Sequence, residues 1–227
     1  MAFKLFQQQE NISMKKVVLL GDSIRMNYCK YVKSKLEGIA EVYYPDDNCR
    51  FAQNLLRFAH EYKRKGGWPD DVDVVHWNAG LWDVMELYGD EPISTLEYYF
   101  SVIPRVDKRL RMLYPNAKIV FATSTSVCEE EYPAHAIRRN STIRKYNAAA
   151  IEALANTDTV INDLYAITEN IPREYRSDMT HFKTDEGAAL LGDKVISVVC
   201  ELMGISPEEI AQKGVEFENY SADKIGY

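Results

Sequence analysis

The sequence predicts an α/β fold in which one parallel β-sheet is covered by helices on both faces. Five short apolar segments alternate along the 227 residues with segments whose apolar residues have helical spacing. Parallel neighbours need a crossover connection, and their strands then become buried on both faces. Alternation of this kind is typical of a doubly covered sheet.

The first half of the chain shows this unit twice and begins it a third time. A strand is expected at 15–20, where an apolar run ends in glycine, with a helix over 23–38. A second strand over 40–45 ends at a proline, and its helix over 51–65 is followed by two glycines. The third strand begins at residue 73 and breaks at Ala79–Gly80.

The second half continues the alternation with longer connections. Pro104 is expected to bend or divide the helix that follows strand three. The remaining expected elements are that helix (94–114), a strand (117–124), a polar loop (125–140), a helix (141–156), a strand (159–165) and a closing helix (185–204).

Composition indicates a single folded domain. Of the residues, 46% are hydrophobic and 27% are charged, and no shift in composition divides the chain. We expect a domain over 15–212, preceded by an extension over 1–14 and followed by a tail over 213–227.

Charge and cysteine usage exclude several functions. The net charge of −7 disfavours nucleic acid and anionic membranes as partners. Neither a signal peptide nor a run of ~20 apolar residues is present, which predicts a cytoplasmic protein. The four cysteines form no CxxC pair and no HExxH occurs, so we expect no metal and no cofactor. Oligomeric state stays open.

Ser23 is the first candidate for chemistry, because Gly21-Asp22-Ser23 directly follows the first strand. Ligands of parallel sheets bind at the carboxyl ends of the strands, where this hydroxyl would lie. Taken alone, the serine is more easily explained as a helix N-cap. A nucleophilic serine also requires a base and a group that orients the base.

His181 is the histidine best placed to act as that base. Asp178 precedes it by three residues, so a tight turn brings the carboxylate beside the imidazole. The other three histidines fall in a helix (His60), a strand (His76) and the long loop (His135), where core or surface roles explain them better.

At these two segments the sequence resembles the SGNH, or GDSL-like, hydrolases. The resemblance rests on GDSI (21–24) after the first strand and on residues 178–195, which are similar to the family's DxxH block and terminal helix. It covers roughly residues 15–203. It implies a flavodoxin-like three-layer α/β/α sandwich and a triad of Ser23 as nucleophile, His181 as base and Asp178 as its orienter.

The same resemblance implies an oxyanion hole, and here the sequence departs from the family. The amide of Ser23 is the first donor, and Cys49 stands where the family has glycine. The family's GxND block reads Gly80-Leu81-Trp82-Asp83, so tryptophan replaces asparagine. We expect Asn78 to supply the missing carboxamide, with the Trp82 indole N–H as the alternative donor.

Substrate contacts are expected from residues beside these blocks, namely Asp22, Arg25, Arg50, Gly80 and Trp82. Asp22 is expected mainly to bond loop amides. The two arginines would favour an anionic substrate group, although Arg50 has acidic neighbours that offer a local salt bridge instead.

These features predict a metal-independent serine esterase that cleaves a short-chain ester, above all an acetyl ester, of a small molecule or carbohydrate. Three alternatives stay open: a binding module that has lost catalysis, an acyltransferase with the same triad, and a cysteine hydrolase built on Cys49.

Overall fold

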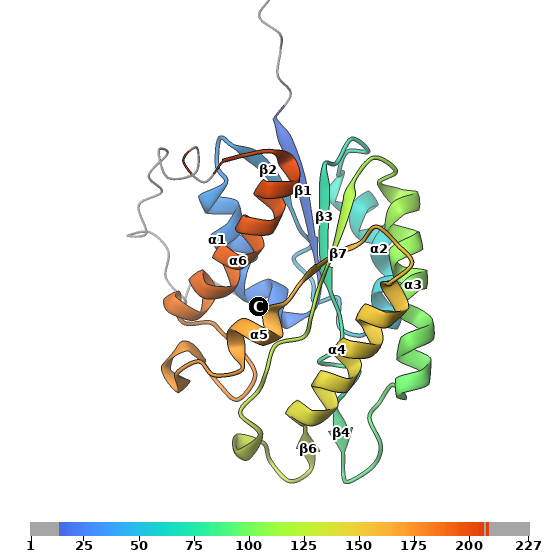
Figure 1. Cartoon of the computed structure of the whole chain (residues 1–227), viewed down its shortest axis with the longest axis vertical. Helices are drawn as coiled ribbons and strands as arrows, with labels where there is room; N and C mark the ends of the chain where they lie inside the picture. The colour runs from blue at the N-terminus through green and yellow to red at the C-terminus, as the bar shows by residue number, and fades with distance from the viewer. Residues whose placement is uncertain (1–13, 207, 209–227) are drawn as a thin grey trace, which may run out of the picture.

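The centre of the protein is a five-stranded parallel sheet, seen in a computed structural model that describes residues 14–206 and 208 (Figure 1). The strand order is β2-β1-β3-β5-β7, with parallel pairing throughout. The strands are β1 (Lys15–Leu20), β2 (Ala40–Tyr43), β3 (Val74–Asn78), β5 (Lys118–Ala122) and β7 (Val160–Asn162). The predicted α/β class is confirmed.

Helices cover both faces of this sheet. Figure 1 shows α1 (Ser23–Lys35) and α6 (Asp185–Met203) together on one side, with α2 (Ala52–Gly66), α3 (Leu96–Leu113) and α4 (Asn140–Leu154) on the other. The shorter helical segments are η1 (Glu129–Glu131), α5 (Leu164–Thr168) and η2 (Arg173–Tyr175). Of the two segments expected outside the domain, only Met14 lies within the described residues.

Helix α3 runs through Pro104 without dividing, contrary to one of the two outcomes expected there. Proline removes one backbone hydrogen bond and strains the preceding turn. The buried face of α3, which includes Tyr99, Val102, Ile103 and Leu110, packs on the core and outweighs that loss.

A small antiparallel pair was not foreseen from the sequence. Strand β4 (Glu86–Leu87) pairs with β6 (Ala136–Ile137), and we call this pair the β4/β6 arm. It joins the segment after β3 to the long loop after β5. Figure 1 shows it beyond the carboxyl ends of the sheet strands, so it lies at the edge where ligands of such sheets bind.

His76 lies in the core, in agreement with its expected role. Its ring nitrogens face the Tyr28 hydroxyl at 3.5 Å and the Asn162 carboxamide at 3.0 Å. Burial lowers the pKa of His76 to about 3, so the ring is neutral and structural. No helix within the described residues is long and apolar enough to cross a membrane.

Candidate active site

Ser23, His181 and Asp178 meet at the carboxyl edge of the sheet in one chain of hydrogen bonds. The Nε2 atom of His181 lies 2.8 Å from the Ser23 Oγ. The opposite ring nitrogen, Nδ1, lies 2.8 Å from Asp178 Oδ2 and 3.1 Å from Oδ1. A serine hydroxyl, an imidazole and a carboxylate in this order can transfer a proton from the hydroxyl to the imidazole.

The turn at 177–182 explains why one short segment carries both the acid and the base. Asp178 Oδ1 accepts hydrogen bonds from the amides of Thr180, at 2.7 Å, and His181, at 2.8 Å. The Ser177 amide closes the turn on the His181 carbonyl at 2.9 Å. The carboxylate is therefore held against its own backbone while it faces the imidazole.

The ionisation of Asp178 follows from these contacts. Partial burial acts to raise the pKa of Asp178, but the His181 ring and the two amides outweigh it and hold that pKa well below its usual range. Asp178 is therefore a carboxylate at neutral pH. A carboxylate in this position can orient the Nδ1 proton and stabilise an imidazolium.

Asn27 links the nucleophile helix to the histidine turn, a role that sequence reasoning missed. Its Oδ1 accepts the Phe182 amide at 2.8 Å, and the side chain is 1% exposed. Asn27 lies one helical turn after Ser23, so it faces the same direction as the nucleophile. A polar residue four positions after Ser23 was the available signal.

The nucleophile loop is built by Gly21, Asp22 and Asn78. Gly21 has φ of 159°, and a Cβ there would overlap the Asn78 carboxamide. Asp22 caps α1 by accepting the Ile24 amide at 2.9 Å, and the same oxygen accepts Asn78 Nδ2 at 2.8 Å. Burial raises the pKa of Asp22, and these two donors oppose that rise.

Two of the candidate oxyanion donors are already engaged. The Cys49 amide donates to the Gly21 carbonyl at 3.0 Å, which corrects the expectation that it faces an oxyanion. The loop after β2 folds back onto the nucleophile loop, and this contact uses the amide. Asn78, only 2% exposed, donates one of its two amide N–H bonds to Asp22.

The other two candidates have unused N–H groups. The Ser23 amide at the start of α1 and the Trp82 indole Nε1 make no hydrogen bond to any other residue of the described chain. Trp82 is partly exposed and packs edge-on against Phe51, with ring centroids 5.4 Å apart.

Gly80 and Asp83 shape the turn that carries Trp82. Gly80 has φ of 149°, and a Cβ there would press on Ser124 Oγ. Asp83 accepts the Ala52 amide at 3.1 Å and the Ser94 hydroxyl at 2.8 Å. These contacts join the turn to α2 and to the segment before α3.

Arg25 has a structural role, contrary to its expected contact with substrate. Its side chain is 1% exposed and donates to the carbonyls of Pro45 at 2.9 Å and Asp47 at 2.6 Å. Two residues beyond Ser23 in a helix, it points to the opposite side. Arg50 is exposed, with φ of 54°, and its amide bonds Asn48 Oδ1 at 2.8 Å.

Comparisons with known proteins place the fold. No protein-family model matches the chain, and no curated protein does. Among solved structures, a lipase/acylhydrolase from Enterococcus faecalis has a TM-score of 0.63 at 19% identity, over 86% of this chain and 98% of its own. The chain has the SGNH hydrolase fold.

Two carbohydrate-directed enzymes share the SGNH fold with this chain. An acetyl xylan esterase, AlAXEase, has a TM-score of 0.60 at 19% identity, over 81% of this chain and 99% of its own. A carbohydrate esterase family 3 protein from Talaromyces cellulolyticus has a TM-score of 0.61 at 16% identity, over 85% of this chain and 100% of its own.

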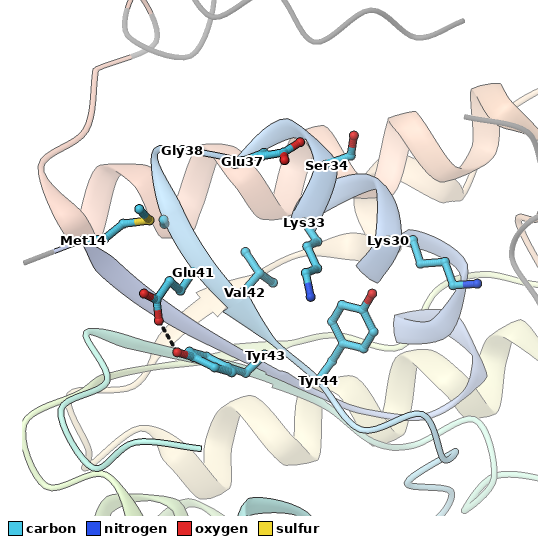
Figure 2. A pocket seen from close by; sticks show the side chains of 11 residues that line it. Met14, Lys30, Lys33, Ser34, Glu37, Gly38, Glu41, Val42, Tyr43 and Tyr44 are labelled. Atoms are coloured by element: carbon cyan, nitrogen blue, oxygen red, sulfur yellow. Dashed lines mark hydrogen bonds between the residues drawn. The ribbon is translucent and has the colours of Figure 1, made fainter. Parts of the chain in front are cut away.

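A separate cavity of about 560 Å³ lies away from the triad, between the edge strand β2 and α1 (Figure 2). The Lys33 ammonium stands 5.6 Å from the centre of the Tyr44 ring, and the Tyr43 hydroxyl bonds Glu41. None of the triad residues lines this cavity. The described residues also contain no group of three or more metal-ligating side chains.

Proposed function

We propose that the protein is a serine esterase that hydrolyses short acyl esters through an acyl-enzyme on Ser23. The observation that carries this proposal is the 2.8 Å contact between Ser23 Oγ and His181 Nε2, with Asp178 on the far side of the ring. The resemblance of the fold to lipases, acylhydrolases and acetyl xylan esterase supports the reaction class.

The reaction has two halves. His181 Nε2 accepts the hydroxyl proton as Ser23 Oγ attacks the ester carbonyl, and the same proton then passes to the leaving alkoxide. The product alcohol leaves and an acyl ester remains on Ser23. Water then gives a proton to His181 and attacks that ester, which releases the carboxylic acid and restores the serine.

For the oxyanion we propose the Ser23 amide and the Trp82 indole as donors. Both N–H groups are unused, whereas the Cys49 amide donates to Gly21 and Asn78 already donates one of its two amide N–H bonds to Asp22. Trp82 would then perform the task of the asparagine that the family pattern places at this position. Loss of one such donor costs about 10²–10³ in kcat in a comparable hydrolase.

For the substrate we propose a short acyl group, acetyl above all, on a small molecule or carbohydrate. The proposed oxyanion donor Trp82 packs against Phe51, and both aromatic rings are partly exposed. Aromatic faces pack on sugar rings as well as on small apolar groups. The acetyl xylan esterase among the structural neighbours favours the same class.

An activity-based fluorophosphonate probe tests the nucleophile. We expect covalent labelling of the wild-type protein, none of Ser23→Ala, and normal labelling of Ser101→Ala, an exposed serine on α3. p-Nitrophenyl acetate hydrolysis should follow the same pattern. Persistent labelling of Ser23→Ala would disprove the assignment, and absence of labelling in the wild type would favour a binding module.

A second experiment tests the oxyanion donor. Trp82→Phe keeps a ring against Phe51 and removes the N–H, so kcat should fall about 10²-fold or more. Trp68→Phe, at the far end of α2, is the matched control and should keep full activity. Unchanged kcat in Trp82→Phe would return the assignment to Asn78.

The products of the reaction distinguish a hydrolase from an acyltransferase. Transfer of the acyl group to an added alcohol in preference to water would identify an acyltransferase.

A further inference from the structure

Arg138 is a buried cation that follows the β4/β6 arm and bonds segments next to the triad residues. It follows β6 directly and is 8% exposed. Its Nε donates to the Leu81 carbonyl at 2.5 Å, and its Nη1 donates to the Tyr132 hydroxyl at 3.1 Å. Two bonds in different directions fix the plane of the guanidinium group.

Both anchors of Arg138 belong to segments that border the triad. Leu81 lies beside Trp82 in the turn after β3. The Tyr132 hydroxyl bonds Thr180 Oγ1 at 2.5 Å, and Thr180 immediately precedes His181. Burial raises the pKa of Asp22, and Arg138 is one of the cations opposing that rise, which places its charge near the nucleophile loop.

Arg138 makes no direct ion pair with any carboxylate of the described residues. Among the described residues, no carboxylate lies within 4.0 Å of its guanidinium, and both acceptors are neutral oxygens. Its Nη2 makes no hydrogen bond to the described chain and is not enclosed. A desolvated cation with a free donor favours binding of an anion.

Arg176 shows what a purely structural arginine looks like in this protein. It is also buried, but both of its terminal nitrogens are engaged, by Ser126 at 2.8 and 2.6 Å and by the Thr168 carbonyl at 3.1 Å. In Arg138 only Nε and Nη1 donate hydrogen bonds to the described chain. The unused Nη2 therefore distinguishes Arg138 from Arg176.

We propose that Arg138 binds a carboxylate on the substrate, so that the preferred substrates are acyl esters of acidic molecules such as sugar acids or hydroxy acids. This inference rests on the proposed function, because Ser23 must still attack the ester. The guanidinium would pair with the carboxylate through Nη2, a contact that arginine makes with defined geometry. Arg138 thus takes the role that the sequence suggested for Arg25 and Arg50.

A matched pair of esters tests the proposal. 3-Acetoxybenzoate carries the carboxylate, and 3-acetoxybenzamide has the same acetyl group and a neutral substituent of similar size. We expect Arg138→Gln to lower the ratio of kcat/KM for the acid over the amide roughly 10- to 100-fold, as for a hydrogen bond between charged groups. Arg138→Lys should give an intermediate ratio, because the charge stays while the guanidinium geometry is lost.

Controls separate specificity from folding. Arg139→Gln removes the neighbouring exposed arginine, which pairs with Glu86, and should leave the ratio unchanged. Thermal unfolding checks each variant. In the wild type, higher salt should lower the same ratio through screening, a readout that needs no variant. A ratio equal in wild type and Arg138→Gln, or equally low in the glutamine and lysine variants, overturns the proposal.

A binding measurement separates this inference from the proposed function. In a Ser23→Ala background, calorimetry measures binding of 3-acetoxybenzoate with Arg138 present or replaced by glutamine. At least tenfold weaker binding after replacement supports the carboxylate site even where the wild type hydrolyses nothing. Equal binding in both proteins counts against the site even where hydrolysis is rapid.

Discussion

Replacing Asp83 by asparagine should remove a pH-dependent loss of stability. Asp83 is 1% exposed, and burial raises its pKa from 3.8 to about 6, against the opposing hydrogen bonds of Ser94 and the Ala52 amide. Asparagine can keep both contacts, since its oxygen accepts the Ala52 amide and its nitrogen donates to the Ser94 hydroxyl.

The direction in which the stability changes with pH follows from proton binding to Asp83. Between pH 4 and 6 the unfolded chain has released the Asp83 proton while the folded protein still holds it, so the folded state loses relative stability as pH rises. The shift of roughly two units corresponds to about 3 kcal/mol in the free energy of unfolding. Above pH 6 to 7 both states are ionised, and this contribution stays constant.

Urea unfolding of both proteins between pH 4 and 8 measures this effect. The free energy of unfolding of the wild type minus that of Asp83→Asn should fall by about 2 kcal/mol between pH 4 and 7 and then level off, because part of the roughly 3 kcal/mol is already lost at pH 4. Taking the difference removes the contribution of the other titrating groups. A difference that is flat, or that rises with pH, would refute the reasoning.

Three further substitutions test the triad and its supports. Asp178→Asn should lower kcat about 10⁴-fold in a protein that still folds, because the amide favours the wrong imidazole tautomer; activity near that of the wild type would contradict it. Asn27→Ala leaves the buried Phe182 amide without an acceptor, so unfolding free energy should drop by about 1–3 kcal/mol and kcat should fall with it. If only stability changes, Asn27 does not position His181. Gly80→Ala should cost about 1–3 kcal/mol by thermal unfolding, because its Cβ meets Ser124 Oγ; an unchanged melting temperature would show that the turn adjusts.

The meeting of Ser23, His181 and Asp178 could be predicted because the sequence signals for it are local. Asp178 and His181 occupy one turn, Ser23 follows a strand directly, and a parallel sheet brings such strand ends to one edge. The donors of the oxyanion hole could not be predicted in the same way. Whether the Cys49 amide is free depends on how its loop folds back onto Gly21, a contact between segments far apart in sequence.

The two arginines illustrate the same limit. Arg25 is close to Ser23 in sequence, but helix geometry turns it toward the carbonyls of Pro45 and Asp47. Arg138 is 115 positions after Ser23 and is brought to the Leu81 carbonyl next to Trp82 at the end of the β4/β6 arm. Strands of two residues leave no periodic pattern in a sequence, so neither the arm nor its arginine was foreseen.

The β4/β6 arm makes two loops change together. Leu87 pairs with Ala136, and Glu86 pairs with Ile137. An insertion in either loop that shifts this register by one residue would displace Arg138 by about 3.3 Å and turn its side chain to the other face of the pair. Arg138 would then swing away from the Leu81 carbonyl. A change in the length of either loop would therefore remove the proposed contact between Arg138 and a substrate carboxylate without any substitution at Arg138 itself.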